Sequence, residues 1–240
     1  MNKEEKLLRL IKEDELVHLC QDMVRIKTVN PPGNERENAD YIAEFLRKAG
    51  IEVEILAHSE TRATVVARLK GSGEKPGLLY SGHLDVVPVG AQEWLHDPFG
   101  GEVIEGKLWG RGASDMKGGN AAIMIAAKVL AEAKVPLKGD LILNFNAGEE
   151  GEQLGANAAA AHLAGEKVQA VVIAEPSSND VYIAEKGAFW LELTTYGKTA
   201  HGSTPHLGQN AIMMMVALLS EFDRLLSLTR SIPCLAALRA

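Results

Sequence analysis

The chain has 240 residues, of which 46% are hydrophobic and 24% charged, and this composition predicts a packed globular domain, alone or with part of a second. A formal net charge of -7 and the lack of any run rich in lysine and arginine exclude a general nucleic-acid binder. The sequence shows no secretory signal and no apolar stretch of about eighteen residues, so we expect a cytoplasmic protein without a membrane partner.

Apolar residues at helical spacing predict helices at residues 3–26, 35–49, 118–133, 154–163 and 211–228. Short apolar runs between turn residues predict strands at residues 51–56, 63–69, 77–81, 141–146, 168–174 and 189–196. The alternation favours an α/β domain with a mostly parallel mixed sheet, buried and flanked by helices. After Lys186 the pattern changes, which places a first domain at residues 1–186 and the beginning of a smaller α+β domain at 187–240. Cys20 lies in an amphipathic helical pattern and is expected to be reduced and buried.

Polar segments follow several of these strands or lie in glycine-rich loops. They are SGHLD at 81–85, GRGASD at 110–115, GEEG at 148–151 and AEP at 174–176. Loops after the carboxyl ends of parallel strands gather around one crevice. One histidine, His83, and five carboxylates are therefore expected to converge there; the carboxylates are Asp85, Asp115, Glu149, Glu150 and Glu175.

Such a cluster has an electrostatic consequence. Two like charges about 4 Å apart repel by roughly 4 kcal/mol at an effective dielectric near 20, and protonation could hardly neutralise five carboxylates at pH 7. One or two divalent cations are the simpler remedy, and mixed imidazole and carboxylate ligands suit zinc, with cobalt or manganese as alternatives. Taken singly, each residue has an ordinary interpretation: a structural His83, an Asp115 that caps a helix, a solvated Glu149–Glu150 pair and an exposed Glu175.

Other catalytic chemistries fit less well. The sequence contains no Gly-x-Ser-x-Gly nucleophile elbow, no phosphate-binding loop and no His-Glu-x-x-His helix. The Gly110-Arg111-Gly112 segment lacks the third glycine of a dinucleotide-binding fingerprint. Neither cysteine lies in a polar loop, which argues against a cysteine nucleophile.

Together these segments resemble the metallohydrolase family of acetylornithine deacetylase, succinyl-diaminopimelate desuccinylase, aminoacylase and carboxypeptidase G. The resemblance covers nearly the whole chain and is carried by the strings SGHLDVVP, WLHDPF, GRGASDMKGG, AGEEG and AHGSTPHLGQNAI. It implies hydrolysis of an amide bond in N-acyl amino acids, of the deacetylase or desuccinylase type, or in short peptides. It also implies that residues 1–186 are the catalytic metal-binding domain and residues 187–240 the beginning of a lid or dimerisation domain, which is cut short here.

The resemblance implies a role for each residue of the cluster. His83 and Glu175 would bind one zinc, Glu150 a second, and Asp115 would bridge the two. Glu149 would be the general base, and Asp85 would orient His83, since a carboxylate partner fixes the tautomer of a ligating imidazole. As adjacent residues, Glu149 and Glu150 are expected to point apart, and the peptide bond after Asp115 is expected to be cis.

The second domain contributes one further candidate. In relatives, the histidine matching His201 reaches an active site, often that of the partner subunit, and steadies the oxyanion; the plain alternative is a surface histidine. A homodimer through the lid helix is expected on the same basis. Relatives supply a last metal ligand and the residues that grip the substrate carboxylate from segments without a counterpart here. An inactive metal-binding or dimerisation fragment is therefore the competing hypothesis, while the segment after Lys186 argues against an aminopeptidase of related architecture.

Overall fold

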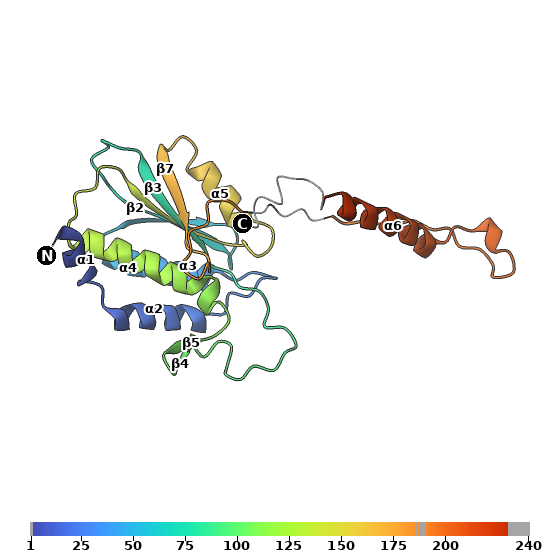
Figure 1. Ribbon diagram of the computed structural model, residues 1–240, viewed down its shortest axis with the longest axis horizontal. Helices are drawn as coiled ribbons and strands as arrows, with labels where there is room; N and C mark the ends of the chain where they lie inside the picture. The colour runs from blue at the N-terminus through green and yellow to red at the C-terminus, as the bar shows by residue number, and fades with distance from the viewer. Residues whose placement is uncertain (1, 186, 188–190, 230–240) are drawn as a thin grey trace. The chain divides into compact units, whose positions relative to one another are not determined.

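The computed structural model describes residues 2–185, 187 and 191–229, which divide into two compact units, residues 1–181 and 182–240. The elements of the first unit are drawn in Figure 1. Its helices are α1 (Lys3–Leu8), α2 (Glu13–Arg25), α3 (Arg36–Lys48), α4 (Gly118–Glu132) and α5 (Leu154–His162). Its strands are β1 (Glu52–Ala57), β2 (Ala63–Leu69), β3 (Gly77–His83), β4 (Glu102–Ile104), β5 (Lys107–Trp109), β6 (Leu141–Asn146) and β7 (Val168–Ile173). The boundary between functional domains expected at residues 186 and 187 stays a prediction.

A five-stranded sheet in the order β1-β2-β6-β3-β7 forms the centre of this unit. The strands β1, β2 and β6 pair antiparallel, while β3 runs parallel to both β6 and β7. The expected α/β class, a mixed sheet flanked by helices, is confirmed. Helices α2, α3 and α4 cover one face, and α5 lies on the other (Figure 1).

Side chains of the strands alternate between the two faces, and this alternation places the core. Val65, Leu143 and Phe145 point toward α2, α3 and α4, where they pack with Met23 and Ile42 in one buried apolar cluster. Thr64 lies on the opposite face, where it contacts Gly155 of α5. The main apolar core therefore lies between the sheet and the helices α2 to α4.

Some expectations for the first unit need correction. The helix expected over residues 3–26 is two helices, because the chain turns at residues 9–12 and a new helix begins at the acidic run Glu13-Asp14-Glu15, which favours a helix N-terminus. Strand β7 is largely exposed instead of buried, since it is an edge strand. The β4–β5 hairpin was not predicted. Cys20 is buried and free, as expected.

The second unit contains a short 3-10 turn, Pro205–Leu207, and one long helix, α6 (Ala211–Thr229). The predicted helix is therefore confirmed. The strand expected over residues 189–196 is not formed at residues 191–196, and its first two residues lie outside those described. A single bridge, Lys198 with Gln209, is the only β pairing in the described part of this unit. No helix among the described residues is long and apolar enough to cross a membrane.

Candidate metal centre

The carboxyl ends of three neighbouring strands bring the candidate residues to one edge of the sheet. In the parallel register, His83 at the end of β3 lies beside Asn146 at the end of β6, and Ser81 lies beside Ile173 at the end of β7. The segments that continue from β3, β6 and β7 carry Asp85, the Glu149–Glu150 turn and Glu175. These side chains lie close together at the carboxyl ends of the strands, as predicted.

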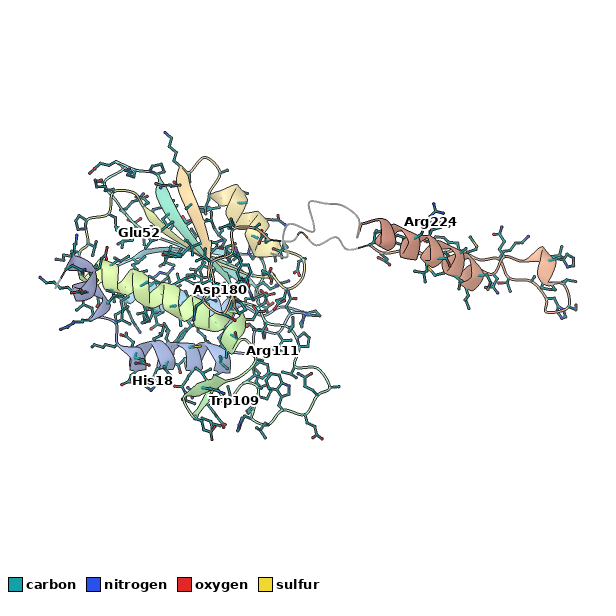
Figure 2. The ribbon with its side chains drawn as sticks, in the orientation of Figure 1. His18, Glu52, Trp109, Arg111, Asp180 and Arg224 are labelled. Atoms are coloured by element: carbon teal, nitrogen blue, oxygen red, sulfur yellow. The ribbon has the colours of Figure 1, made fainter. Side chains whose placement is uncertain are left out.

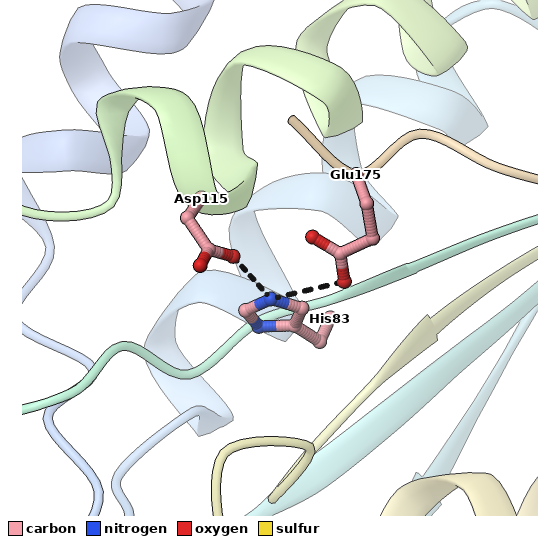
Figure 3. A group of neighbouring side chains, drawn as sticks. All are labelled: His83, Asp115 and Glu175. Carbon is pink, nitrogen blue, oxygen red and sulfur yellow. Dashed lines mark hydrogen bonds and ion pairs between the residues drawn. The ribbon is translucent and has the colours of Figure 1, made fainter. Parts of the chain in front are cut away.

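His83 lies at the centre of this cluster, and its side chain is only 1% exposed. Its Nε2 is 2.9 Å from Oδ1 of Asp115 and 3.5 Å from Oε1 of Glu175. Figure 3 draws both contacts as dashed lines. On the other side of the ring, Nδ1 is 2.9 Å from the backbone carbonyl oxygen of Asp85 and 3.6 Å from its carboxylate. Because the carbonyl oxygen can only accept, Nδ1 carries a proton and Nε2 faces the carboxylates.

Asp115 lies in a kinked turn, Ala113–Lys117, that leads into α4, and its own backbone is not helical, with φ -119° and ψ 98°. No side chain caps either this turn or α4, and Asp115 instead makes its hydrogen bond to His83. The helix-cap interpretation of Asp115 is therefore wrong. The Asp115–Met116 peptide bond is cis, as the resemblance implied.

Glu149 and Glu150 converge on His83 instead of pointing apart. One carboxylate oxygen of each lies within 4.8 Å of the other and of an imidazole nitrogen of His83. The expectation was wrong because these residues form a tight turn, where side chains do not alternate as they do in a strand. Backbone N–H groups of both glutamates donate to the carboxylate of Asp85, at 3.0 Å and 3.1 Å, and hold the turn in this form.

The acidic surroundings change the ionisation of His83 and Glu175. Burial disfavours the imidazolium, but hydrogen bonds to Asp115 and Asp85 and the charge of Glu175 outweigh burial and raise the pKa of His83 to about 10. For Glu175, burial raises the pKa to about 7. The charge of His83 lowers the pKa of Glu175, while the charges of Asp115 and Glu149 raise it further. In the metal-free protein the imidazolium is thus the cation that the cluster holds at its centre.

The other carboxylates divide according to their partners. The hydrogen bond to His83 lowers the pKa of Asp115. Burial would raise the pKa of Asp85, but hydrogen bonds from His83, Asn30 and the backbone of Glu149 lower it overall. Burial, followed by the charge of Asp115, raises the pKa of Glu150. A raised pKa at Glu150 and Glu175 indicates a cluster that is short of positive charge.

The donor set suits a divalent metal. Two groups of ligand atoms share His83: one adds Asp115 and Glu175, the other Glu149 and Glu150, and within each group the atoms lie within 4.8 Å of one another. An imidazole nitrogen surrounded by carboxylate oxygens is a ligand set typical of zinc and related transition metals. The carboxylates are partly exposed, with side-chain exposures of 51% for Asp115 and 40% for Glu175, so a cation can reach them from solvent.

His201 belongs to the second unit and is exposed. Its Nδ1 accepts the backbone N–H of Ser203 at 3.2 Å and is 2.8 Å from the hydroxyl oxygen of the same residue. Because Nδ1 accepts an N–H, the neutral ring carries its proton on Nε2, which is free to donate. Nε2 of His201 is therefore available as a hydrogen-bond donor, and the role of this residue in an active site stays a prediction.

Residues that the sequence did not single out surround the cluster. Asn30 donates to Asp85 at 2.9 Å, Glu35 accepts the backbone N–H of Gly148 at 3.1 Å, and Arg62 pairs with Glu35 at 2.7 Å. Lys117 is fully buried, and its Nζ donates to the carbonyl oxygens of Met23 and Ile26 at the end of α2. These polar residues lie in separate segments and form no sequence motif with the cluster. The sequence offered a hint only for Lys117, which lies two residues after Asp115.

Aromatic residues lie along the segment between β3 and the Asp115 turn. Arg111 stacks over the ring of Trp94, with Cζ 5.2 Å from its centroid. His96 packs edge-on against Trp109 at 4.7 Å, and Figure 2 shows Trp109 at the β4–β5 hairpin. The charge of Arg111 contributes to the lowered pKa of Asp115, so this basic side chain belongs to the electrostatic surroundings of the cluster.

Comparison with known proteins identifies relatives of the chain. A sequence model of Peptidase family M20/M25/M40 matches residues 79–223. The chain is 38% identical over 218 residues to a probable succinyl-diaminopimelate desuccinylase of Staphylococcus epidermidis, covering 90% of this chain and 53% of that protein. It is 32% identical to a succinyl-diaminopimelate desuccinylase of Methylobacterium radiotolerans, over 86% of this chain and 55% of that one. The chain thus spans about half the length of the curated relatives it matches.

Solved structures share the fold. Human carnosine dipeptidase 1 has a TM-score of 0.62 at 24% identity, over 81% of this chain and 43% of its own. A tripeptidase of Staphylococcus aureus has a TM-score of 0.60 at 20% identity, over 88% of this chain and 56% of its own. At these identities the likeness supports the α/β architecture and carries no statement about substrate.

Proposed function

Because the chain belongs to peptidase family M20/M25/M40, a family of hydrolases that act on amide bonds, we propose that it forms the metal-binding catalytic part of an enzyme that hydrolyses N-acyl amino acids. The observation that carries the proposal is the convergence of acidic side chains on His83, with Asp115 and Glu175 in one group of possible ligands and the Glu149–Glu150 pair beside it. Relatives named as succinyl-diaminopimelate desuccinylases favour a succinyl or similarly small acyl group, with short peptides as the alternative substrate.

We propose that His83, Asp115, Glu150 and Glu175 would hold a divalent cation, with zinc as the expected metal, and that Asp115 would be shared if two ions bind. When bound, such a cation polarises the amide carbonyl and lowers the pKa of water toward neutrality. Asp85 holds the proton on Nδ1 of His83 through its backbone carbonyl, so that Nε2 is directed at the carboxylates.

Glu149 is proposed as the general base. Its carboxylate lies in the same turn as Glu150 and within 4.8 Å of His83, so it is close enough to act on a water at the cluster. The carboxylate takes a proton from the attacking water and delivers it to the departing amine nitrogen. His201, with its proton on Nε2, is proposed to donate to the oxyanion that forms on the substrate.

Residues 1–186 are proposed as the catalytic domain and residues 187–240 as the beginning of a lid that mediates a homodimer. The support for the dimer is the apolar surface of α6, where Ile212, Met213 and Leu219 are each more than half exposed. Exposed apolar helix faces often mark protein interfaces.

The test compares Glu149→Ala with Glu150→Ala, two neighbouring glutamates with different proposed roles. Zinc content and hydrolysis of acetyl-amino acids, succinyl-amino acids and dipeptides are measured for each. Glu149→Ala is expected to keep its zinc and lose about 10²- to 10⁴-fold in rate, because only a general base is removed. Glu150→Ala is expected to hold less zinc.

Three outcomes separate the possibilities. Loss of zinc in Glu149→Ala would overturn the assignment of the base. A wild-type chain that binds zinc and hydrolyses none of the substrates supports the competing hypothesis, an inactive metal-binding chain. A wild-type chain that binds no divalent metal contradicts the proposed function itself.

A further inference from the structure

The turn that carries Glu149 and Glu150 is held by side chains instead of by secondary structure. It follows β6 and precedes α5. Each of four successive backbone N–H groups donates to a side-chain oxygen: Ala147 to Thr64 at 3.2 Å, Gly148 to Glu35 at 3.1 Å, and Glu149 and Glu150 to the two carboxylate oxygens of Asp85. These acceptors come from three separate segments of the chain, so the turn has little freedom to shift.

One of these acceptors, Glu35, has a side chain that is completely buried. An isolated buried carboxylate is costly, so its charge needs a partner. Arg62 provides one with two parallel hydrogen bonds, Nε to Oε2 at 3.0 Å and Nη2 to Oε1 at 2.7 Å. The third nitrogen of the guanidinium, Nη1, pairs with Glu152 at the other end of the same turn.

The guanidinium of Arg62 is wedged between two glycines. A Cβ built on Gly33 would lie 2.4 Å from Cζ of Arg62, and one built on Gly148 would lie 2.8 Å from Nη2. Both glycines also have positive φ, +88° and +73°, a conformation that favours glycine. The backbone on either side therefore fits closely around the guanidinium and fixes its position.

We propose that the Glu35–Arg62 pair is a positioning device that sets the turn of Glu149 and Glu150 in the geometry the metal centre needs. Arg62 holds Glu152 on one side of the two glutamates, while Glu35 holds the N–H of Gly148 on the other. Neither residue touches the cluster itself, so both act through the turn. The role in catalysis rests on the proposed function; the ordering of the turn does not.

The chain contains a matched control for this pair. Arg68, at the other end of β2, also bridges two carboxylates, with Asp140 at 2.8 Å and Glu166 at 2.7 Å. Asp140 also accepts a backbone N–H, from Gly71 at 2.9 Å, as Glu35 does from Gly148. The two arginines are thus similarly buried and each joins two carboxylates, but they hold different loops.

The experiment compares Arg62→Met with Arg68→Met. Amide hydrogen exchange of residues 147–153 is measured in the metal-free chain, and zinc affinity is measured by competition with a chelator. Arg62→Met is expected to exchange at residues 147–150 at least about tenfold faster than wild type, and Arg68→Met at the wild-type rate there. Zinc affinity is expected to fall about 10- to 100-fold in Arg62→Met alone.

Two further variants keep the test decisive. Glu35→Gln preserves the shape of the side chain and an acceptor for the N–H of Gly148 while removing the charge that Arg62 pairs with. It is expected to raise amide exchange in the same turn, and it takes the place of Arg62→Met in the comparison if that variant fails to fold. Arg62→Lys retains the charge without the two parallel hydrogen bonds, so it is expected to restore zinc affinity only in part.

The proposal is overturned if Arg62→Met and Glu35→Gln exchange like wild type at residues 147–150, or if Arg68→Met loosens this turn equally. Equal loosening would mean that any arginine loss weakens the whole unit. If the wild-type chain binds no zinc, the proposed function fails, and the exchange comparison alone still decides whether the pair orders the turn.

Discussion

Replacing Asp85 with asparagine tests the arrangement behind the metal cluster most directly. The carboxylate of Asp85 accepts three N–H groups: Glu149 at Oδ1, and both Glu150 and the side chain of Asn30 at Oδ2. Asparagine has nearly the same shape but offers one oxygen and one NH₂ group. The substitution therefore changes hydrogen bonding and charge with almost no change in volume.

The size of the effect follows from these bonds. If the oxygen of the new asparagine takes the place of Oδ2, it still accepts the bonds from Asn30 and Glu150. The NH₂ group of the asparagine then faces the N–H of Glu149, and this bond is lost. The opposite orientation would set NH₂ against two donors and is worse. One buried N–H left unpaired costs about 1 to 3 kcal/mol. The two remaining bonds also lose their charge, and charge-assisted bonds are about twice as strong as neutral ones. We expect a total loss of about 2 to 4 kcal/mol in the free energy of unfolding.

Urea unfolding of the metal-free chain at pH 7, followed by circular dichroism, measures this loss. Asp140→Asn is the control, since Asp140 also accepts a backbone N–H and a basic side chain but lies away from the cluster. Both variants are expected to lose stability, and only Asp85→Asn is expected to lose zinc affinity. An Asp85→Asn chain that unfolds at the wild-type urea concentration would refute the reasoning, because the turn would then not depend on these bonds.

Two further predictions concern pH. Zinc must displace the proton of His83, whose pKa of about 10 keeps the ring protonated at pH 7, so zinc affinity is expected to rise about tenfold per pH unit between pH 7.5 and 9. Below pH 7 the rise is expected to be steeper, because Glu175, with a pKa of about 7, also loses a proton when zinc binds. Calorimetry in buffers of different ionisation enthalpy measures the proton release, and a zinc affinity independent of pH would contradict the prediction. Burial lowers the pKa of Lys117 to about 7, so above pH 7 the unfolded chain binds more protons at this residue and its contribution to folding stability rises toward pH 10. Lys117→Met is expected to lack this rise, so its stability deficit in urea unfolding should widen from pH 7 to pH 10; a constant deficit would argue against a perturbed lysine.

Much of the fold follows from local pattern. The strand over residues 63–69 and the one over residues 141–146 were predicted with their exact bounds, because each is a short apolar run between turn residues. One topological rule, that loops after parallel strands meet at one edge, placed five of the six candidate residues, whereas Asp115 was included from a glycine-rich loop before α4. His83, Asp115 and Glu175 meet there even though they are separated by dozens of residues in the sequence.

What the sequence did not reveal depends on tertiary contact. Glu35 looks like an ordinary acidic residue at the start of a helix, and Arg62 like a solvated residue before a strand. Their pairing across 27 residues of chain becomes visible only when α3 and β2 pack together. In the same way, Glu149 and Glu150 were wrongly expected to point apart. Acceptors from distant segments impose the turn, and no local sequence rule describes such acceptors.

The position of these acceptors explains how two glutamates can face one histidine before any metal arrives. The two glutamate carboxylates have oxygens within 4.8 Å of each other, and charges at that distance or less repel by roughly 3 kcal/mol or more at an effective dielectric near 20, so an unrestrained turn would relax by moving Glu149 away from Glu150. Asp85 opposes this relaxation on the backbone side, because a shift of the turn would break the bond from the backbone N–H of Glu149 or Glu150 to its carboxylate. The cost of bringing the carboxylates together is thus met during folding, and it need not be taken from the free energy of metal binding. A metal centre built this way should keep its turn ordered in the metal-free state, which is why exchange at residues 147–150 without zinc is the measurement that bears on it most closely.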